Sequence, residues 1–181
     1  MTLPNLITIL RFLMVPIIVL AMMSGHMTAA FFIFLLAGLS DGIDGFIARQ
    51  FDQKSELGAW LDPMADKLLL VSVFIMLGYG GHLPLWLVVL AVSRDLMIVG
   101  GVILASLLHN PVEARPIAVS KVNTAAQIGL AIVVLADLAG FGRIGGLADW
   151  LVLAVAGLTI ASAAAYLITW LRHMAGSGEA S

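Results

Sequence analysis

The chain contains no cysteine and few charged residues, and both absences narrow what it can be. Without cysteine it forms no disulfide and has no thiolate that could act as a nucleophile or hold a metal. Charged residues make up 11% and apolar residues 61% of the 181 residues, whereas a soluble domain has about 25% and 45–50%. The net charge of −2 argues against a nucleic acid as a partner. The composition is that of an integral membrane protein.

Six apolar segments follow one another along the chain, each close to the roughly 20 residues that cross a bilayer as a helix. Breaks rich in glycine, proline and polar residues separate them. We therefore predict an all-α integral membrane protein with six transmembrane helices, at about residues 4–23, 29–50, 58–79, 84–108, 118–138 and 147–171. The helices form a single domain, residues 1–175, and we expect the short polar tail, 176–181, to be disordered.

Basic residues between the predicted helices indicate how the chain is oriented. Arg143 is alone on one side, and the other side carries Arg49, Lys54, Arg115, Lys121 and Arg172. The positive-inside rule places the richer side, and with it both termini, in the cytoplasm. Because the chain starts only a few residues before the first apolar segment, with no transit peptide, we expect a bacterial cytoplasmic membrane rather than a mitochondrial one.

Four aspartates lie close together in the chain, two on each of two consecutive segments. Asp41 and Asp44 are near the end of the second segment, and Asp62 and Asp66 near the start of the third. Spacings of three and four place each pair on one face of its helix. Because the two helices run antiparallel through a short cytoplasmic loop, the pairs can converge at about the same depth. Each carboxylate costs about 2.5–3.5 kcal/mol at the centre of a spanning helix, so the cluster needs compensating cations.

The chemistry of this cluster favours phosphate. Four carboxylates with no histidine or cysteine nearby select Mg²⁺, Mn²⁺ or Ca²⁺ over zinc. Two such cations about 3.5–4 Å apart can clamp the oxygens of a phosphoryl group during in-line displacement. Arg49 can bind a diphosphate through its planar fork. Gly42, Gly45 and Ala48 leave room beside the first pair and Gly58 beside the second. Gly38, Gly42 and Gly45 are also typical of close helix packing.

A motif of eight residues joins these features. The pattern D-x2-D-G-x2-A-R-x8-G-x3-D-x3-D is matched completely by Asp41, Asp44, Gly45, Ala48, Arg49, Gly58, Asp62 and Asp66. It resembles the signature of the CDP-alcohol phosphotransferases, membrane enzymes with six spanning helices. The resemblance implies transfer of a phosphatidyl group from CDP-diacylglycerol to an alcohol, with release of CMP. It also implies two divalent cations (Mg²⁺ or Mn²⁺) and a homodimer.

The resemblance further implies roles for individual residues. Asp41, Asp44, Asp62 and Asp66 would hold the metals, and Asp66 would also accept the proton of the attacking hydroxyl. Gly45, Ala48, Arg49 and Gly58 would line the CDP site. On the first helix Asn5, Thr8 and Arg11 recur every three residues. The first two of these either satisfy backbone groups at the start of the helix or face the nucleotide.

Three other stretches bear on the acceptor alcohol. The opening LPNLITILRFLMVPIIVL resembles both the phosphatidylglycerophosphate synthases and the cardiolipin synthases of this family. SRDLMIVGGVIL at 93–104 and SKVNTAAQ at 120–127 resemble its cardiolipin synthases. In its phosphatidylglycerophosphate synthases a glutamate is expected in place of Asp95, and often a lysine in place of Asn123. We therefore expect phosphatidylglycerol as the acceptor and cardiolipin as the product. Glycerol 3-phosphate, giving phosphatidylglycerophosphate, is the alternative.

Basic residues are the candidates for holding the acceptor's phosphate. The main candidates are Arg94, Arg115 and Lys121, and Arg11 and Lys67 are further ones. Arg94 and Asp95 could instead neutralise each other within the membrane, as intramembrane charges usually do. Because neighbouring residues point about 100° apart on a helix, we expect each to have a partner elsewhere. Arg115 and Lys121 could be topology signals only.

One rival of a different class remains, a small cation transporter whose aspartates line an ion path. It would require a pore or an inverted repeat, and neither is visible in the sequence.

Overall fold

The computed structural model describes the backbone of residues 3–50, 56–107, 118–142 and 146–176, and the side chains of residues 9–40, 64–100, 118–142 and 146–170. Within these ranges the chain is helical, without a strand. The helices are α1 (Leu3–Met23), α2 (Met27–Gln50), α3 (Glu56–Tyr79), α4 (Leu85–Leu107), α5 (Ala118–Leu138) and α6 (Leu147–Gly176). Each predicted segment corresponds to one of them, so the all-α prediction is confirmed. The last helix includes Gly176, and the rest of the predicted tail lies outside the described residues.

After α1 and after α3, the helix ends where glycine allows the backbone to reverse. After α1, Gly25 has φ 74°, and after α3, Gly81 has the same value. In both places the glycine N–H and the N–H that follows it bond back to carbonyls of the last helical turn, for example His26 N to Ala21 O at 2.8 Å. This is the Schellman arrangement, which satisfies carbonyls that a helix end leaves open. A side chain at these glycines would be strained.

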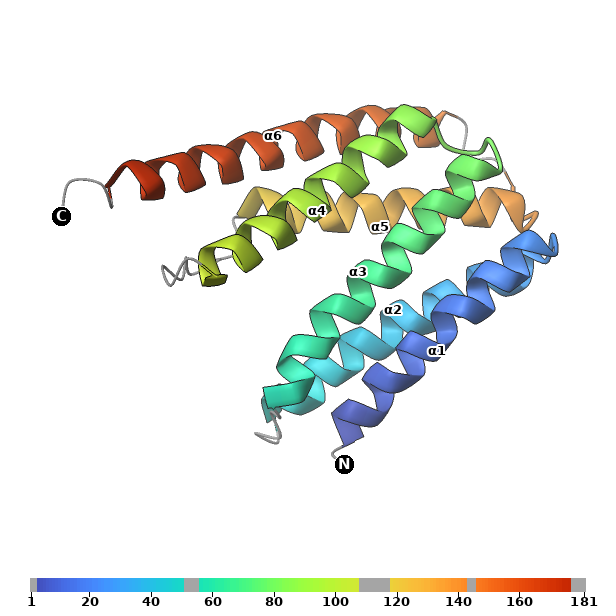
Figure 1. Ribbon diagram of the computed structural model, residues 1–181. Coiled ribbons are helices and arrows are strands. Elements are labelled where there is room, and N and C mark those ends of the chain that lie inside the picture. Colours follow the sequence, from blue (N-terminus) through green and yellow to red (C-terminus); the bar gives the residue numbers. More distant parts are fainter. Residues whose placement is uncertain (1–2, 51–55, 108–117, 143–145, 177–181) are drawn as a thin grey trace. The chain divides into compact units, whose positions relative to one another are not determined.

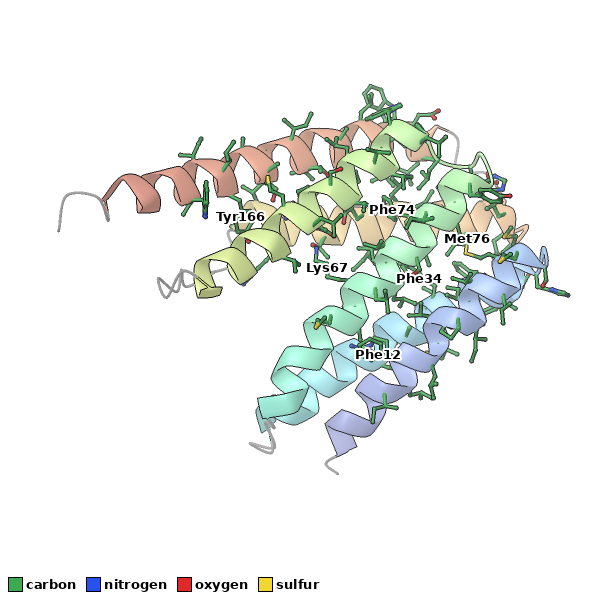
Figure 2. The ribbon with its side chains drawn as sticks, viewed as in Figure 1. Phe12, Phe34, Lys67, Phe74, Met76 and Tyr166 are labelled. Atoms are coloured by element: carbon green, nitrogen blue, oxygen red, sulfur yellow. The ribbon has the colours of Figure 1, made fainter. Side chains whose placement is uncertain are left out.

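The chain divides into two compact units, of which the first comprises Met1–Leu83 and Ala131–Gly146. In this unit α1 packs against both α2 and α3, and Figure 1 shows α2 and α3 running in opposite directions. The buried side of α1 is a stripe at spacings of four, three and four, formed by Arg11, Val15, Ile18 and Met22. Phe34 of α2 and Phe74 of α3, labelled in Figure 2, are also buried. An arginine thus occupies one position of an otherwise apolar stripe.

The second unit comprises Pro84–Leu130 and Leu147–Ser181, so that α5 contributes its first part to this unit and its last turns to the other. Here α4 packs against α6. Leu87, Leu130 and Val155 are fully buried apolar residues of this unit. Among the described side chains of this unit, six polar ones are buried, which are Arg94, Asp95, Asn123, Gln127, Thr159 and Ser162.

Large apolar side chains remain exposed on the helices, as expected where lipid replaces water. On α1 these include Leu13, Ile17 and Leu20, each more than half exposed, and α6 exposes Leu153 and Ile160 similarly. Exposed apolar surface of this extent marks a face that contacts membrane or partner. Among the residues searched, two helices are long and apolar enough to cross a bilayer, Ala118–Leu138 and Leu147–Trp170. Shorter apolar stretches occur at Ile9–Met23 and Met27–Ser40.

Candidate active site

The aspartates of the eight-residue motif all lie on helices, as predicted. Asp41 and Asp44 belong to α2, and Asp62 and Asp66 to α3. Of these four side chains, only that of Asp66 lies within the described ranges. The backbone of the other expected nucleotide-site residues is helical too, but their side chains lie outside those ranges: Asn5, Thr8, Gly45, Ala48, Arg49 and Gly58.

Helix bounds set the depth of each aspartate. Asp44 stands six residues before the end of α2, and Asp62 six residues after the start of α3. At a rise of about 1.5 Å per residue, both lie about 9 Å from the loop that joins the helices. Asp41 and Asp66 stand nine and ten residues from the same helix ends, so they too match in depth. Since the two helices are antiparallel in this unit (Figure 1), the backbone is compatible with the convergence predicted from the sequence.

Asp66 makes an ion pair with Arg11. The arginine Nη1 donates to Asp66 Oδ1 at 2.6 Å, which links α3 to α1. The two side chains differ in exposure, because Arg11 is 1% and Asp66 41% accessible. Arg11 was a further candidate for binding the acceptor's phosphate. Its side chain is buried, and its guanidinium donates to the Asp66 carboxylate. The sequence did not indicate this pairing.

The donor set fits a hard divalent cation. Four carboxylates and a chain without cysteine offer oxygen ligands, as Mg²⁺ and Mn²⁺ prefer. Within the described side chains there is no group of three or more histidines and acids that could hold a metal. Three of the four aspartates lie outside that part of the chain, so the metal site stays a prediction.

The three main candidates for the acceptor's phosphate differ in setting. Arg94, on α4, is buried. Lys121 is exposed in the first turn of α5. Arg115 lies outside the described residues. The role of these three residues in binding the acceptor therefore stays a prediction.

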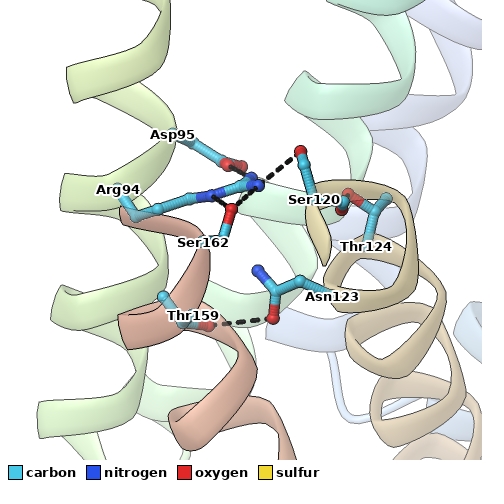
Figure 3. Close-up of polar contacts among 7 residues, drawn as sticks. All are labelled: Arg94, Asp95, Ser120, Asn123, Thr124, Thr159 and Ser162. Carbon is cyan, nitrogen blue, oxygen red and sulfur yellow. Dashed lines mark hydrogen bonds and ion pairs between the residues drawn. The ribbon is translucent and has the colours of Figure 1, made fainter. Parts of the chain in front are cut away.

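Arg94 is the centre of a polar cluster in the second unit (Figure 3). Its Nη1 donates to Asp95 Oδ1 at 2.6 Å. Its Nη2 donates to Ser120 Oγ of α5 at 2.5 Å and to Ser162 Oγ of α6 at 2.6 Å, and its Nε also bonds Ser162, at 3.1 Å. The guanidinium carbon lies 6.0 Å from the centre of the Tyr166 ring, within range of a cation–π contact.

This geometry shows both the neutralising pair and, for Arg94, the expected partners elsewhere in the chain. Neighbouring positions on a helix do not keep Arg94 and Asp95 apart, because the long arginine side chain curls back onto the carboxylate. The mutually neutralising pair is thus present, and Arg94 additionally binds two serines that sequence analysis did not single out. With its donors directed at Asp95, Ser120 and Ser162, the guanidinium ties three helices together.

A second polar contact lies beside the cluster in Figure 3. Thr159 Oγ1 of α6 donates to Asn123 Oδ1 of α5 at 3.0 Å. The amide nitrogens of Asn123 and Gln127, one helical turn apart, are buried without a hydrogen-bond partner. A buried donor without an acceptor costs about 1–3 kcal/mol, so a water or a ligand oxygen would stabilise this face. The spacing of Ser120, Asn123 and Gln127 along an apolar helix was the sequence signal for this stripe.

Thr159→Val tests the α5–α6 contact. Valine keeps the shape of threonine but cannot donate, so Asn123 Oδ1 loses its partner. We expect a loss of about 1 kcal/mol in the free energy of unfolding, measured by denaturant titration in detergent micelles. Thr169→Val is the matched control, because Thr169 is exposed and bonds only the Ala165 carbonyl of its own helix. Equal losses in both variants would contradict a specific contact between the helices.

A bundle of apolar helices with an acidic pair on each of two consecutive helices defines a class of helical membrane proteins. The family model of the CDP-alcohol phosphatidyltransferases matches residues 1–171. The chain belongs to the CDP-alcohol phosphatidyltransferase family, and the resemblance read from its eight-residue motif is confirmed.

Curated relatives carry two different names within this family. The chain is 37% identical to cardiolipin synthase (CMP-forming) of Rattus norvegicus over 154 residues, 76% of this chain and 50% of the rat protein. It is 35% identical to the Homo sapiens protein of the same name, with the same coverage. It is 42% identical to a probable phosphatidylglycerophosphate synthase of Mycobacterium tuberculosis over 100 residues, 52% of this chain and 48% of that protein. The chain thus spans about half the length of these relatives.

Proposed function

We propose that this chain transfers the phosphatidyl group of CDP-diacylglycerol to phosphatidylglycerol, giving cardiolipin and CMP. The observation that carries the proposal is the complete eight-residue motif, whose residues belong to the consecutive helices α2 and α3. Two relatives that match 76% of the chain are named cardiolipin synthase (CMP-forming). Membership of the family favours a transferase over a cation transporter.

The proposed reaction is an in-line displacement at one phosphorus. A glycerol hydroxyl oxygen of phosphatidylglycerol forms a bond to the phosphatidyl phosphorus, and the bond from that phosphorus to the bridging oxygen of the diphosphate breaks. The electron pair of the broken bond leaves with CMP. Asp66, the part-exposed carboxylate of the described site, accepts the hydroxyl proton. Arg49 holds the diphosphate, and Gly45, Ala48 and Gly58 leave space for the nucleotide at the helix surface.

Divalent cations complete the proposed site. Asp41, Asp44, Asp62 and Asp66 would hold two of them, Mg²⁺ or Mn²⁺. When bound, the cations neutralise the diphosphate and the negative charge that develops as it is displaced. Each pair shares one face of its helix, so the two carboxylates of a pair can bind the same cation.

The proposed setting is a bilayer crossed by all six helices. Their lengths of 21 to 30 residues correspond to at least about 31 Å at 1.5 Å per residue, enough for the hydrocarbon core. The distribution of basic residues favours a site on the cytoplasmic side. We further propose a homodimer in a bacterial cytoplasmic membrane. The named relatives come from mammals and from a bacterium, so they favour neither membrane.

Glycerol 3-phosphate is the second candidate acceptor, and the match to a probable phosphatidylglycerophosphate synthase favours it. The deciding experiment incubates purified protein with CDP-diacylglycerol and Mn²⁺, then offers phosphatidylglycerol, glycerol 3-phosphate, inositol phosphate or serine. Our proposal predicts cardiolipin and equimolar CMP with phosphatidylglycerol only. Phosphatidylglycerophosphate from glycerol 3-phosphate, with no cardiolipin, would contradict it.

Arg115→Ala tests the acceptor site. If Arg115 binds the acceptor's phosphate, its loss removes a charge-assisted hydrogen bond of about 1.5–3 kcal/mol. We expect the KM for phosphatidylglycerol to rise about tenfold or more, with the KM for CDP-diacylglycerol unchanged. An effect confined to CDP-diacylglycerol would show that Arg115 belongs to the nucleotide side.

A further inference from the structure

Arg11 occupies a position that apolar packing does not explain. It stands at the start of the buried stripe of α1, followed by Val15, Ile18 and Met22. The residue is 1% exposed. Burying a guanidinium among apolar side chains is expensive unless an opposite charge meets it. Asp66 provides an opposite charge, because Arg11 Nη1 donates to Asp66 Oδ1 at 2.6 Å.

The two members of this pair face different surroundings. Asp66 keeps 41% of its side chain accessible, so it can reach a substrate or a cation. Arg11 is buried, and its Nη1 donates to this carboxylate. Carboxylates that act at a metal site are commonly held by hydrogen bonds from such outer partners. The Nη1–Oδ1 hydrogen bond comes from a buried guanidinium, which fixes the position of that carboxylate oxygen.

We propose that Arg11 is a positioning residue that holds the Asp66 carboxylate in the orientation in which it ligates a divalent cation and faces the acceptor hydroxyl. This inference rests on the proposed function, since it assigns Asp66 to that site. It adds a residue outside the eight-residue motif, on a helix that packs against both aspartate-bearing helices.

A mere counter-ion would behave differently from a positioning residue. If Arg11 only balanced charge, its removal would relieve repulsion and divalent cations would bind more tightly. If it orients Asp66, its removal would weaken their binding. Arg11→Lys separates the two cases further, because lysine keeps the charge but lacks the planar fork.

The experiment measures Mn²⁺ binding to the purified full chain by electron paramagnetic resonance, without any acceptor. We expect Arg11→Gln to raise the Kd for Mn²⁺ about tenfold, and to lower kcat for CMP release by about 10–100-fold. Arg11→Lys should change both in the same direction by a smaller factor. In an Asp66→Asn background, Arg11→Gln should alter the Kd by a clearly smaller factor, because the effects of two residues in contact are not additive.

Ile18→Ala is the matched control, since Ile18 lies two turns along the same stripe and is fully buried. It should lower the melting temperature and leave the Kd for Mn²⁺ unchanged. Tighter or unchanged Mn²⁺ binding in both Arg11 variants would overturn the inference, as would an equal change in the Asp66→Asn background. If Mn²⁺ binding follows the expected pattern but no cardiolipin forms, the proposed acceptor fails and the role of Arg11 stands.

Discussion

Asp62→Asn should reduce the release of CMP from CDP-diacylglycerol by about 10²–10³-fold, the effect of removing one group that stabilises charge in a transition state. Asp62 lies near the start of α3, at the depth of Asp44 on α2. Asparagine has nearly the same size as aspartate, but it lacks the negative charge that we propose holds a divalent cation. Added Mn²⁺ should restore part of the rate if the lesion is weaker metal binding. Steady-state rates at rising Mn²⁺ concentrations provide the measurement.

The control is Asp149→Asn, an exposed aspartate in the first turn of α6. It removes the same charge from the chain but lies outside the aspartate cluster, so the rate should not change. If Asp62→Asn keeps the wild-type dependence on divalent cations, the assignment of Asp62 as a metal ligand is wrong.

Arg94→Met should destabilise the protein by about 3–5 kcal/mol, the cost of leaving one member of a buried ion pair without its partner. Methionine fills much of the volume of the arginine stem. The Asp95 carboxylate, 8% exposed, would then lose the guanidinium 2.6 Å away. Ser120 and Ser162 would lose their donor as well, although serine hydroxyls can turn to carbonyls of their own helices. The free energy of unfolding in detergent micelles is the quantity to measure.

The double variant Arg94→Met/Asp95→Leu separates charge from packing. With both charges removed, most of the lost stability should return, because a buried ion pair and an apolar pair of similar volume are often about equal in stability. If the double variant is as unstable as Arg94→Met alone, the serine contacts rather than the ion pair hold this cluster together.

The helices could be predicted because long apolar segments alternate with breaks rich in glycine, proline and polar residues. Segment ends expected near residues 23, 50, 79 and 138 coincide with the ends of α1, α2, α3 and α5. The start of α3 is two residues earlier than expected, and the end of α6 five residues later. Hydropathy does not locate these helix ends, because a helix can continue into polar flanking residues as long as its backbone hydrogen bonds continue.

Only the part of the candidate site that belongs to the eight-residue motif was predicted from the sequence. The spacing of Asp41, Asp44, Asp62 and Asp66 gave a shared helix face, since that depends on local geometry alone. The ion pair of Arg11 with Asp66 joins residues 55 positions apart, and no local rule predicts it. The same holds for Arg94 with Ser162, 68 positions apart. For Arg94 and Asp95, the angle between neighbouring positions did not predict their ion pair, because that angle describes Cβ directions and not the reach of a long side chain.

Counting the Mn²⁺ ions bound per chain, with CDP-diacylglycerol present, tests the central claim most directly. If the aspartates of α2 and α3 converge on one site, a titration followed by electron paramagnetic resonance should saturate at two ions per chain. Their spins should be coupled, as expected for ions about 3.5–4 Å apart. Absence of saturable binding, or binding that survives the loss of both Asp44 and Asp62, would contradict the account.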